Sequence, residues 1–320
     1  MLLLWLASFR IELWPNALVL ANPQLLVLAV VLQVPYALCR AWRLAPLLDV
    51  RIRQHSHESI ARIPRSLLYG SGLLGFFVII VLPLRLGEFT RPILLARARL
   101  PGVGFAEALG AVAAERVLDG LLVCAMLFAG LSFAAVHDTP GLGHVAHFGQ
   151  IMLAVFLFAF VLLLLVARAP QHAGAFVGRL TAPLGRASER LASAFERLAS
   201  TVAGLAGHRQ SFTFLTATLV YWAITVTQLW LVLRACGIPL GITEAMVIVA
   251  LVGLSIQLPG GPAQVGSFQL ATSLALGLFL DDAGVRAAGS SFAAVMYALS
   301  LGGAAMLAIA GAALLAWQRK

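Results

Sequence analysis

Residues 82–91 read Leu-Pro-Leu-Arg-Leu-Gly-Glu-Phe-Thr-Arg, and residues 259–269 read Pro-Gly-Gly-Pro-Ala-Gln-Val-Gly-Ser-Phe-Gln. Both stretches interrupt long apolar runs. Proline removes a backbone donor and glycine lowers helix stability, so neither stretch continues a helix. Because lipid satisfies no backbone polar group, a broken helix in a membrane must be buried in protein or line a cavity. These two breaks therefore predict a membrane fold with two interrupted helices.

The overall composition is that of a membrane protein. The chain has 320 residues, 61% apolar and 11% charged, and its mean hydropathy is +0.96; soluble domains carry about 25% charged residues. Apolar runs continue to Trp317, so we expect a single all-α, polytopic membrane domain over residues 1–320. The formal net charge of +9 is collected in a few segments beside apolar runs, a pattern typical of membrane topology and not of nucleic-acid binding.

The distribution of arginine predicts which loops face the cytoplasm. Six arginines fall in residues 40–65 and six fall in residues 168–209, whereas residues 137–147 contain neither lysine nor arginine. By the positive-inside rule, the two basic segments are cytoplasmic and the third faces outward. We therefore expect a multi-pass protein of the inner (cytoplasmic) cell membrane.

About six spanning helices are expected between these loops. They are residues 1–9, 16–39, 106–136, 148–167, 212–236 and 286–316. The first is short against the roughly 20 residues that a bilayer requires. Either it is interfacial or the start codon assigned to the chain is too late.

The two breaks lie in segments that are expected to re-enter the membrane. For residues 66–99, a crossing helix and a re-entrant hairpin compete. Arg65, Arg97 and Arg99 favour the hairpin, because they place both ends on the same side. Residues 242–280 are expected to form a second hairpin that enters from outside.

The two halves, residues 1–136 and 148–320, then form an inverted-topology arrangement, typical of a repeat. The breaks share a short likeness, in which Leu82-Pro83 and Gly87-Glu88-Phe89 match Leu258-Pro259 and Gly266-Ser267-Phe268. This likeness supports the topology and no more.

The second basic segment, residues 168–209, contains apolar side chains spaced by three and four positions. This spacing predicts an amphipathic helix. Such a helix lies on the inner membrane surface, or it is a cytosolic helix packed on the membrane domain; the same stripe serves both interpretations.

Six charged residues form the densest polar group inside the apolar runs: Arg85, Glu88, Arg91, Glu115, Arg116 and Asp119. A charge at a helix centre costs roughly 2.5–3.5 kcal/mol on insertion scales, so these residues must pair or line a wet cavity. Arg85, Glu88 and Arg91 are three positions apart, a spacing that favours pairing. Glu115 and Asp119 are four apart on one helical face, with Arg116 about 100° from Glu115. Two interpretations remain open. The group is a salt-bridge network that holds two segments together, or it lines a cavity for a polar or anionic headgroup, where arginine binds phosphate through two hydrogen bonds.

The second break adds neutral candidates for substrate binding: Pro259, Gly260, Gly261, Gln264, Gly266 and Gln269. Its unwound backbone lines a cavity or only kinks the helix path. The histidines lie in loops or at segment edges, and the cysteines lie singly in apolar runs. We therefore expect no catalytic residue, no metal and no cofactor.

Several of these motifs resemble one family. Arg40-Ala-Trp-Arg43, residues 82–91 and Glu115-Arg116-Val-Leu-Asp119 look like the signatures of the lysylphosphatidylglycerol synthase transmembrane, or flippase-like, family. The resemblance covers nearly the whole chain. The second break resembles the family's later Pro/Gly-rich segment, with Gln269 where an acid is common and Ala263 where glycine is frequent.

The resemblance implies translocation of a lipid between leaflets. Bifunctional members also carry a C-terminal soluble synthase domain, and no such segment follows the last span in this sequence. We expect a flippase- or scramblase-like, non-enzymatic protein for a phospholipid or polyprenyl-phosphate lipid with an anionic or aminoacylated headgroup. The alternative is a non-catalytic accessory subunit of a lipid-modifying or glycosyltransferase system. Expected partners are membrane lipids, with a second copy or a membrane enzyme as the protein partners to consider, and no nucleic acid.

Overall fold

A computed structural model describes residues 11, 15, 18–56, 62–134, 140–204, 208–257 and 261–317. This part of the chain is helical, without a strand. The longer helices are α2 (Pro23–Trp42), α3 (Ala45–His55), α4 (Arg65–Val81), α6 (Phe105–Phe133), α7 (Pro140–Arg168), α8 (Pro170–Leu180), α9 (Arg186–Ala203), α10 (His208–Ala235), α11 (Ile242–Gln257), α12 (Ser267–Leu276) and α14 (Ser290–Trp317). The short elements are η1 (Pro83–Phe89), α5 (Thr90–Arg97), η2 (Ala182–Leu184), η4 (Pro262–Gln264), α13 (Asp282–Gly284) and η5 (Val285–Gly289).

Five helical segments among the described residues are long and apolar enough to cross a membrane. They are Pro23–His55, Phe105–Phe133, Leu142–Arg168, Arg209–Ala235 and Asp282–Trp317. They correspond in order to five of the six expected spans, and the sixth, residues 1–9, lies outside the described residues. The expected all-α, polytopic architecture is confirmed.

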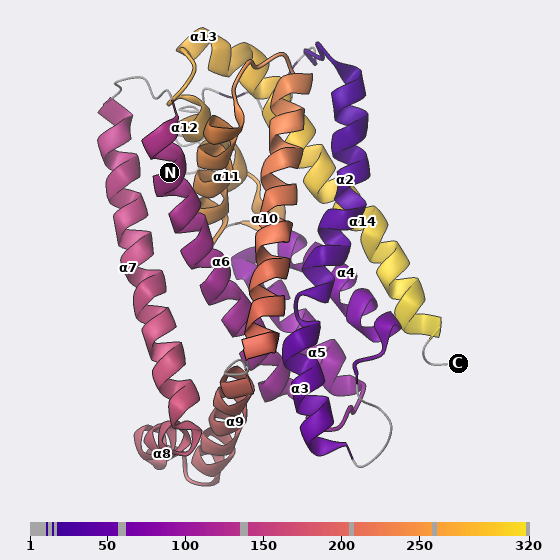
Figure 1. The fold of residues 1–320 in the computed structure, drawn as a ribbon, viewed down its shortest axis with the longest axis vertical. Coiled ribbons are helices and arrows are strands. Elements are labelled where there is room, and N and C mark those ends of the chain that lie inside the picture. Colours follow the sequence, from indigo (N-terminus) through magenta and orange to yellow (C-terminus); the bar gives the residue numbers. More distant parts are fainter. Residues whose placement is uncertain are drawn as a thin grey trace.

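Both breaks lie at the tips of helical hairpins. After α4 the chain turns through η1 into α5, which packs back on α4, and after α11 it returns through η4 into α12, which packs on α11. In Figure 1, α4 and α5 lie in the half of the molecule that holds α3 and α9, whereas α11 and α12 lie in the half that holds α13. The two hairpins therefore reach the centre from opposite ends.

The two halves of the chain interlock. The first hairpin helix, α4, packs along α14 of the second half, and the second hairpin helix, α11, packs against α6 of the first half. Helix α2 of the first half and helix α10 of the second half pack on each other, and η1 contacts η4. This packing of each half on the other brings the two breaks together, with α2, α6, α10 and α14 around them.

The backbone conformation of the two breaks shows which of their residues correspond, and it corrects the alignment predicted from the sequence. Each break contains two consecutive residues in left-handed conformations, with φ between 53° and 58°: Leu84, Arg85, Ala263 and Gln264. Each pair directly follows a proline, Pro83 in the first break and Pro262 in the second. Pro83 therefore matches Pro262 and not Pro259, which lies outside the described residues. The matching of Gly87 with Gly266 is unchanged, and it now needs no insertion between proline and glycine.

The amphipathic helix predicted in residues 168–209 is α9, and it packs on the membrane domain. Gly110 of α6 is so close to α9 that a Cβ atom there would lie 2.6 Å from the carbonyl oxygen of Leu198. An ion pair joins the same two helices, with 3.3 Å between Arg197 Nε and Glu107 Oε1. Of the two interpretations of this stripe, the packed helix is the one that the structure contains.

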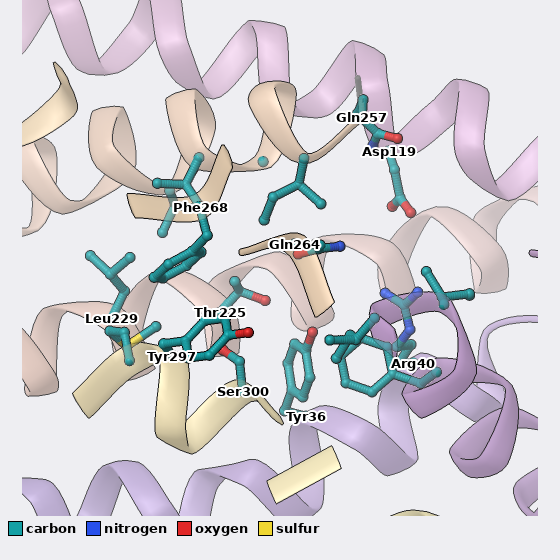
Figure 2. A pocket seen from close by; sticks show the side chains of 18 of the residues that line it. Tyr36, Arg40, Asp119, Thr225, Leu229, Gln257, Gln264, Phe268, Tyr297 and Ser300 are labelled. Atoms are coloured by element: carbon teal, nitrogen blue, oxygen red, sulfur yellow. The ribbon is translucent and has the colours of Figure 1, made fainter. Parts of the chain in front are cut away.

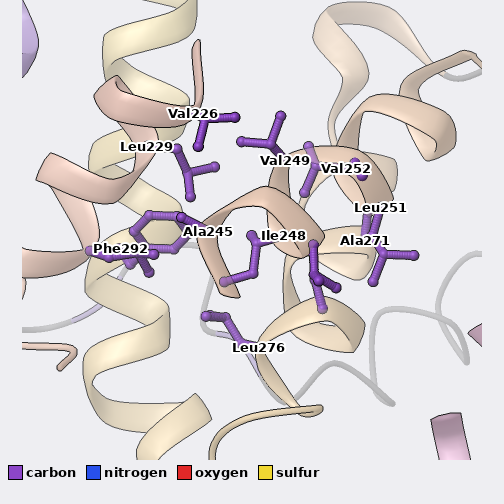
Figure 3. Close-up of a cluster of buried hydrophobic side chains, with 14 of the residues drawn as sticks. Val226, Leu229, Ala245, Ile248, Val249, Leu251, Val252, Ala271, Leu276 and Phe292 are labelled. Atoms are coloured by element: carbon purple, nitrogen blue, oxygen red, sulfur yellow. The ribbon is translucent and has the colours of Figure 1, made fainter. Parts of the chain in front are cut away.

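The second hairpin is embedded in a core of small and branched apolar side chains. Figure 3 shows Val226 and Leu229 of α10 facing Val249 of α11, with Phe292 of α14 on the same side as Leu229. In lipid, such helices are held by van der Waals packing because the surroundings are equally apolar. The close packing fixes the position of the second break beside the charged residues of the first half.

Candidate functional site

Arg43, at the end of α2, is the centre of the charged cluster. Its guanidinium is fully buried, and its Nη1 and Nη2 atoms donate to the two oxygens of Asp119 at 2.6 and 3.0 Å. It also donates to Glu115. The indole Nε1 of Trp222 donates to the same Asp119 carboxylate at 3.0 Å. The two carboxylates thus share a face of α6, as their spacing predicts, but their main partner is an arginine that we did not place in the site.

Arg116 lies closer to these carboxylates than its position on the helix suggests. Its Nη2 atom donates to Glu115 Oε1 at 2.7 Å and lies 3.6 Å from Asp119 Oδ2. Its Nε atom is 3.9 Å from Glu88 Oε2. The 100° separation applies to the directions in which side chains leave the helix, and the long arginine side chain bends back across it.

The first break supplies one ion pair and one helix cap. Arg85 pairs with Glu88 three positions later, as expected. Arg85 Nη1 also donates to the backbone carbonyl of Ile256 at 2.8 Å, in the last turn of α11. Because the last carbonyls of a helix lack partners within the helix, this bond joins the first break to the beginning of the second.

Arg91 does not pair with Glu88. It is buried and donates to the backbone carbonyl of Ala41, and its Nη1 atom is 3.8 Å from Glu115 Oε2. Residue 91 lies in α5, after the unwound segment, so the three-residue spacing from Glu88 does not place the two side chains together. Arg91 therefore contacts the cluster through Glu115 and does not line the cavity.

Arg40 is the arginine of the cluster without a carboxylate partner within 4 Å in the described part of the chain. Its Nη1 atom donates to the hydroxyl of Tyr221 at 3.0 Å, and its Cζ atom lies 4.4 Å from the centre of the Phe76 ring. The hydroxyl of Tyr36 is 3.2 Å from that of Tyr221. Aromatic faces and hydroxyls thus hold a cation that remains available to an anion.

The cluster has a formal surplus of two positive charges. It contains five arginines and three carboxylates: Arg40, Arg43, Arg85, Arg91, Arg116, Glu88, Glu115 and Asp119. A buried charge is costly unless it is paired. The surplus therefore favours an anionic ligand at this place.

A cavity of about 180 Å³ opens beside the surplus charge. Figure 2 shows Arg40 and Asp119 on one side, Phe268, Leu229 and Tyr297 on the other, and Gln264 between them. Neutral polar side chains add further hydrogen-bonding groups to the wall: Tyr36, Thr225, Gln257 and Ser300. One end of the cavity is cationic, and the other end is mainly apolar with scattered neutral donors and acceptors.

The twelve predicted site residues lie in different places relative to the cavity. Four of them line the cavity: Arg85, Arg116, Asp119 and Gln264. Three support it from behind through the ion pairs described above: Glu88, Arg91 and Glu115. Gly261 and Gly266 lie beside the lining, and Pro259 and Gly260 lie outside the described residues.

Gln269 lies outside the cavity lining, unlike Gln264. Its side chain does not line the cavity but accepts a hydrogen bond from the backbone N–H of Gly266 at 2.8 Å, at the start of α12. The third position of a helix is well placed for this capping contact because the first helical N–H groups lack partners. Gln269 therefore shapes the second break and does not add a donor or acceptor to the cavity.

Sequence reasoning missed Arg40, Arg43 and the polar residues of the second half. The two arginines end an apolar run next to a basic loop, so they were counted as topological charges. Their spacing of three positions on one helical face was the available signal. Tyr297 and Ser300 are also three positions apart, but both are neutral residues of one apolar helix, α14, where their spacing alone does not indicate a site. Among the described residues, no group of three or more His, Cys, Asp or Glu side chains has a metal-binding arrangement.

Comparison with protein families places the chain among membrane domains. The family model described as "Lysylphosphatidylglycerol synthase TM region" matches residues 1–318. Comparison with curated proteins found no match, and comparison with solved structures found none either. With its five candidate spans, the chain is a multi-pass membrane protein, and because the match covers almost its entire length, it belongs to the lysylphosphatidylglycerol synthase transmembrane-region family.

Proposed function

We propose that this protein translocates a lipid with a phosphate-bearing, anionic headgroup between the leaflets of the inner membrane, with its basic loops in the cytoplasm, and that it does not modify the lipid chemically. The observation that carries the proposal is the surplus of two positive charges beside a cavity between two helix breaks. A phosphate in this cavity would compensate the surplus, and arginine presents donors in the geometry that phosphate oxygens accept.

The electrostatics favour an anionic over an aminoacylated headgroup. An ammonium group would need a carboxylate to bind it. The three carboxylates of the cluster, Glu88, Glu115 and Asp119, already have arginine partners. A cationic headgroup would therefore add to the positive surplus, whereas a phosphate reduces it.

The size of the cavity is consistent with binding of the headgroup alone. Pockets that enclose drug-sized ligands have volumes of roughly 300–1,000 Å³, and this cavity is smaller, at about 180 Å³. The acyl chains would stay in lipid while the headgroup passes the contact between η1 and η4. Relative movement of the interlocked hairpins would expose the headgroup to either end in turn.

The test is headgroup-resolved translocation in proteoliposomes of the purified full-length chain. We would compare phosphatidylglycerol, its aminoacylated form and a polyprenyl phosphate, with and without a proton gradient. Transport of an anionic lipid above protein-free liposomes is expected. Arg40→Gln should slow it about 10- to 100-fold, the equivalent of one charged hydrogen bond of about 1.5–3 kcal/mol.

The matched control is Arg97→Gln, which removes an exposed arginine of α5 outside the cavity. Arg40→Lys, which keeps the charge, should recover part of the rate. Transport that is equally fast in Arg40→Gln and Arg97→Gln would exclude the cavity as the path. No transport of any lipid by a folded sample would favour an accessory subunit of a lipid-modifying or glycosyltransferase system.

A further inference from the structure

A second pocket lies at the end of the molecule that holds α3 and the beginnings of α4 and α10. Its volume is about 800 Å³, and it is formed by residues of α2, α3, α4, α10 and the segment before α4. Four arginines line it, one of each from α3, the loop, α4 and α10: Arg53, Arg62, Arg65 and Arg209. All four are exposed. This basic pocket is separate from the central cavity and shares no lining residue with it.

The charge of the basic pocket is poorly compensated. Asp49 is the acidic residue of the lining, and its Oδ1 atom accepts a hydrogen bond from the backbone N–H of Ile63 at 2.8 Å. Within the described ranges, no carboxylate lies within 4 Å of the four guanidinium groups. Four arginines from four different segments that converge around one acid form a site for an anion with several acceptor oxygens.

The position of the pocket indicates that its anion belongs to a lipid. Trp42, which is 40% exposed, lies in its wall at the end of α2, and tryptophan is enriched at the level of lipid headgroups. The apolar side chains of α2 exposed directly before it, such as Val31 and Val34, are those of a lipid-facing surface. Juxtamembrane arginines at this level attract anionic lipids.

The basic pocket and the central cavity lie along the same helices. On α10, Thr213 lines the pocket and Tyr221 lines the cavity, eight residues or about 12 Å apart. Between them α2 and α10 are in contact, with Cys39 Sγ 3.5 Å from the carbonyl oxygen of Ala217. The two places thus lie at successive levels of α10, separated by this contact between α2 and α10.

We propose that the basic pocket binds the phosphate group of an anionic lipid from the leaflet at its own end, before that headgroup moves to the central cavity. Binding is independent of transport, whereas the order of the two steps rests on the proposed function. The shared chemistry of a phosphate group also fits inorganic phosphate, so the experiment separates the two sources.

The test measures lipid binding to the purified full-length chain by native mass spectrometry. Phosphatidylglycerol is titrated, with phosphatidylcholine as the zwitterionic comparison. Arg65→Gln/Arg209→Gln should weaken binding of one phosphatidylglycerol about thirty-fold, equivalent to about 2 kcal/mol, since a juxtamembrane arginine contributes about 1 kcal/mol. Arg65→Lys/Arg209→Lys keeps the charges and should bind nearly as the wild type does.

The matched control is Arg186→Gln/Arg190→Gln, which removes the same charge from exposed positions on α9. If both double variants bind phosphatidylglycerol equally well, the pocket is not its site. In a second arm, inorganic phosphate is titrated calorimetrically into the protein in phosphatidylcholine nanodiscs at constant ionic strength. Tight phosphate binding without any preference for phosphatidylglycerol would overturn the lipid assignment.

The same samples separate this proposal from the proposed function. Selective lipid binding that depends on Arg65 and Arg209, combined with no translocation, would support the basic pocket and contradict the translocase. Translocation that depends on Arg40 and is unaffected in Arg65→Gln/Arg209→Gln would support the translocase and contradict the order of steps.

Discussion

The two helix breaks share one backbone feature and differ in chemistry. In both, a proline precedes two left-handed residues, and a glycine follows two positions after them. The matched side chains then diverge, because Arg85 corresponds to Gln264 and Glu88 corresponds to Ser267. All eight charged members of the central cluster belong to the first half of the chain. The second break therefore forms without charged side chains of its own, and the charges of the first break have a further role.

The second break depends on side chains from elsewhere for part of its hydrogen bonding. Arg85 donates to the carbonyl of Ile256 before the break, and the hydroxyl of Tyr297 donates to the carbonyl of Ala263 within it, each at 2.8 Å. Unwound backbone at membrane depth needs such partners. The first break thus contributes charge to the cavity, and the second contributes neutral groups held by its neighbours.

The largest effect is expected from breaking the charged network. Asp119→Ala removes the carboxylate that receives two hydrogen bonds from Arg43 and one from Trp222. Leaving one partner of a buried pair uncompensated costs about 3–5 kcal/mol. We expect a strongly lowered unfolding temperature of the purified chain in nanodiscs.

The matched change in the second half of the chain is Thr272→Val. Thr272 is fully buried, lines the cavity and donates only to the carbonyl of Phe268 in its own helix. Its loss should cost at most about 1 kcal/mol. Equal unfolding temperatures for the two variants would show that the Asp119 carboxylate contributes no more to stability than the Thr272 hydroxyl.

The second prediction tests whether each break requires glycine at its matched position. A Cβ atom on Gly87 would lie 2.3 Å from the backbone nitrogen of Ile79, and Gly266 has φ +87°, which side chains rarely adopt. Gly87→Ala and Gly266→Ala should each lower stability by about 1–3 kcal/mol, through overpacking in the first case and backbone strain in the second.

Gly261 is the control for this pair. Its φ is −71°, and a Cβ atom there would approach no atom closer than 4.0 Å. Gly261→Ala should leave the thermal unfolding of the chain unchanged. A tolerated Gly87→Ala would contradict the close approach of η1 to α4, and a tolerated Gly266→Ala would contradict the left-handed conformation assigned to Gly266.

The sequence predicted the breaks themselves better than their register. Proline, glycine and charge inside apolar runs are local signals, and they located both hairpins. The matching of Pro83 with Pro262 depends on the left-handed residues that follow each proline. Their conformation cannot be predicted from residue type, since leucine and alanine, at Leu84 and Ala263, rarely adopt it. Pro259 was the more conspicuous choice because it ends the apolar run.

The central cluster was predicted in part for a similar reason. Charges within apolar runs are conspicuous, so all three carboxylates and three of the five arginines were found. Arg40 and Arg43 lie at the end of a helix, where a basic residue is also explained by topology. Only packing shows that Arg43 turns inward, where it is fully buried.

The third prediction exchanges neutral for acidic side chains in the second break. Gln264 lines the cavity at the position that matches Arg85. Gln264→Glu would reduce the positive surplus from two to one and should slow transport of an anionic lipid about tenfold, which corresponds to 1.4 kcal/mol. The measurement is headgroup-resolved translocation in proteoliposomes.

Gln269→Glu is the matched control, only five positions away. A carboxylate there can still accept the N–H of Gly266, and an acid in the first turn of a helix is favourable by about 0.3–1 kcal/mol. Transport should be close to that of the wild type, whereas thermal stability should fall, because Gln269 is only 5% exposed and a buried charge is costly. If Gln269→Glu slows transport as much as Gln264→Glu, acidity anywhere in this break matters and the lining assigned to Gln264 is wrong.

The smallest effect is expected for Tyr297→Phe. This change removes the one hydrogen bond that the hydroxyl donates to Ala263, while the ring keeps its contact with Phe268, 5.7 Å between centroids. A neutral hydrogen bond contributes about 0.5–1.5 kcal/mol, and water in the cavity can replace the lost donor, so the decrease in unfolding free energy should lie at the lower end of that range. Arg85→Gln, which disturbs the other external contact of the second break and also leaves Glu88 without its closest partner, should cost more. A Tyr297→Phe variant that is less stable than Arg85→Gln would mean that the neutral break, and not the charged one, limits the stability of the membrane domain.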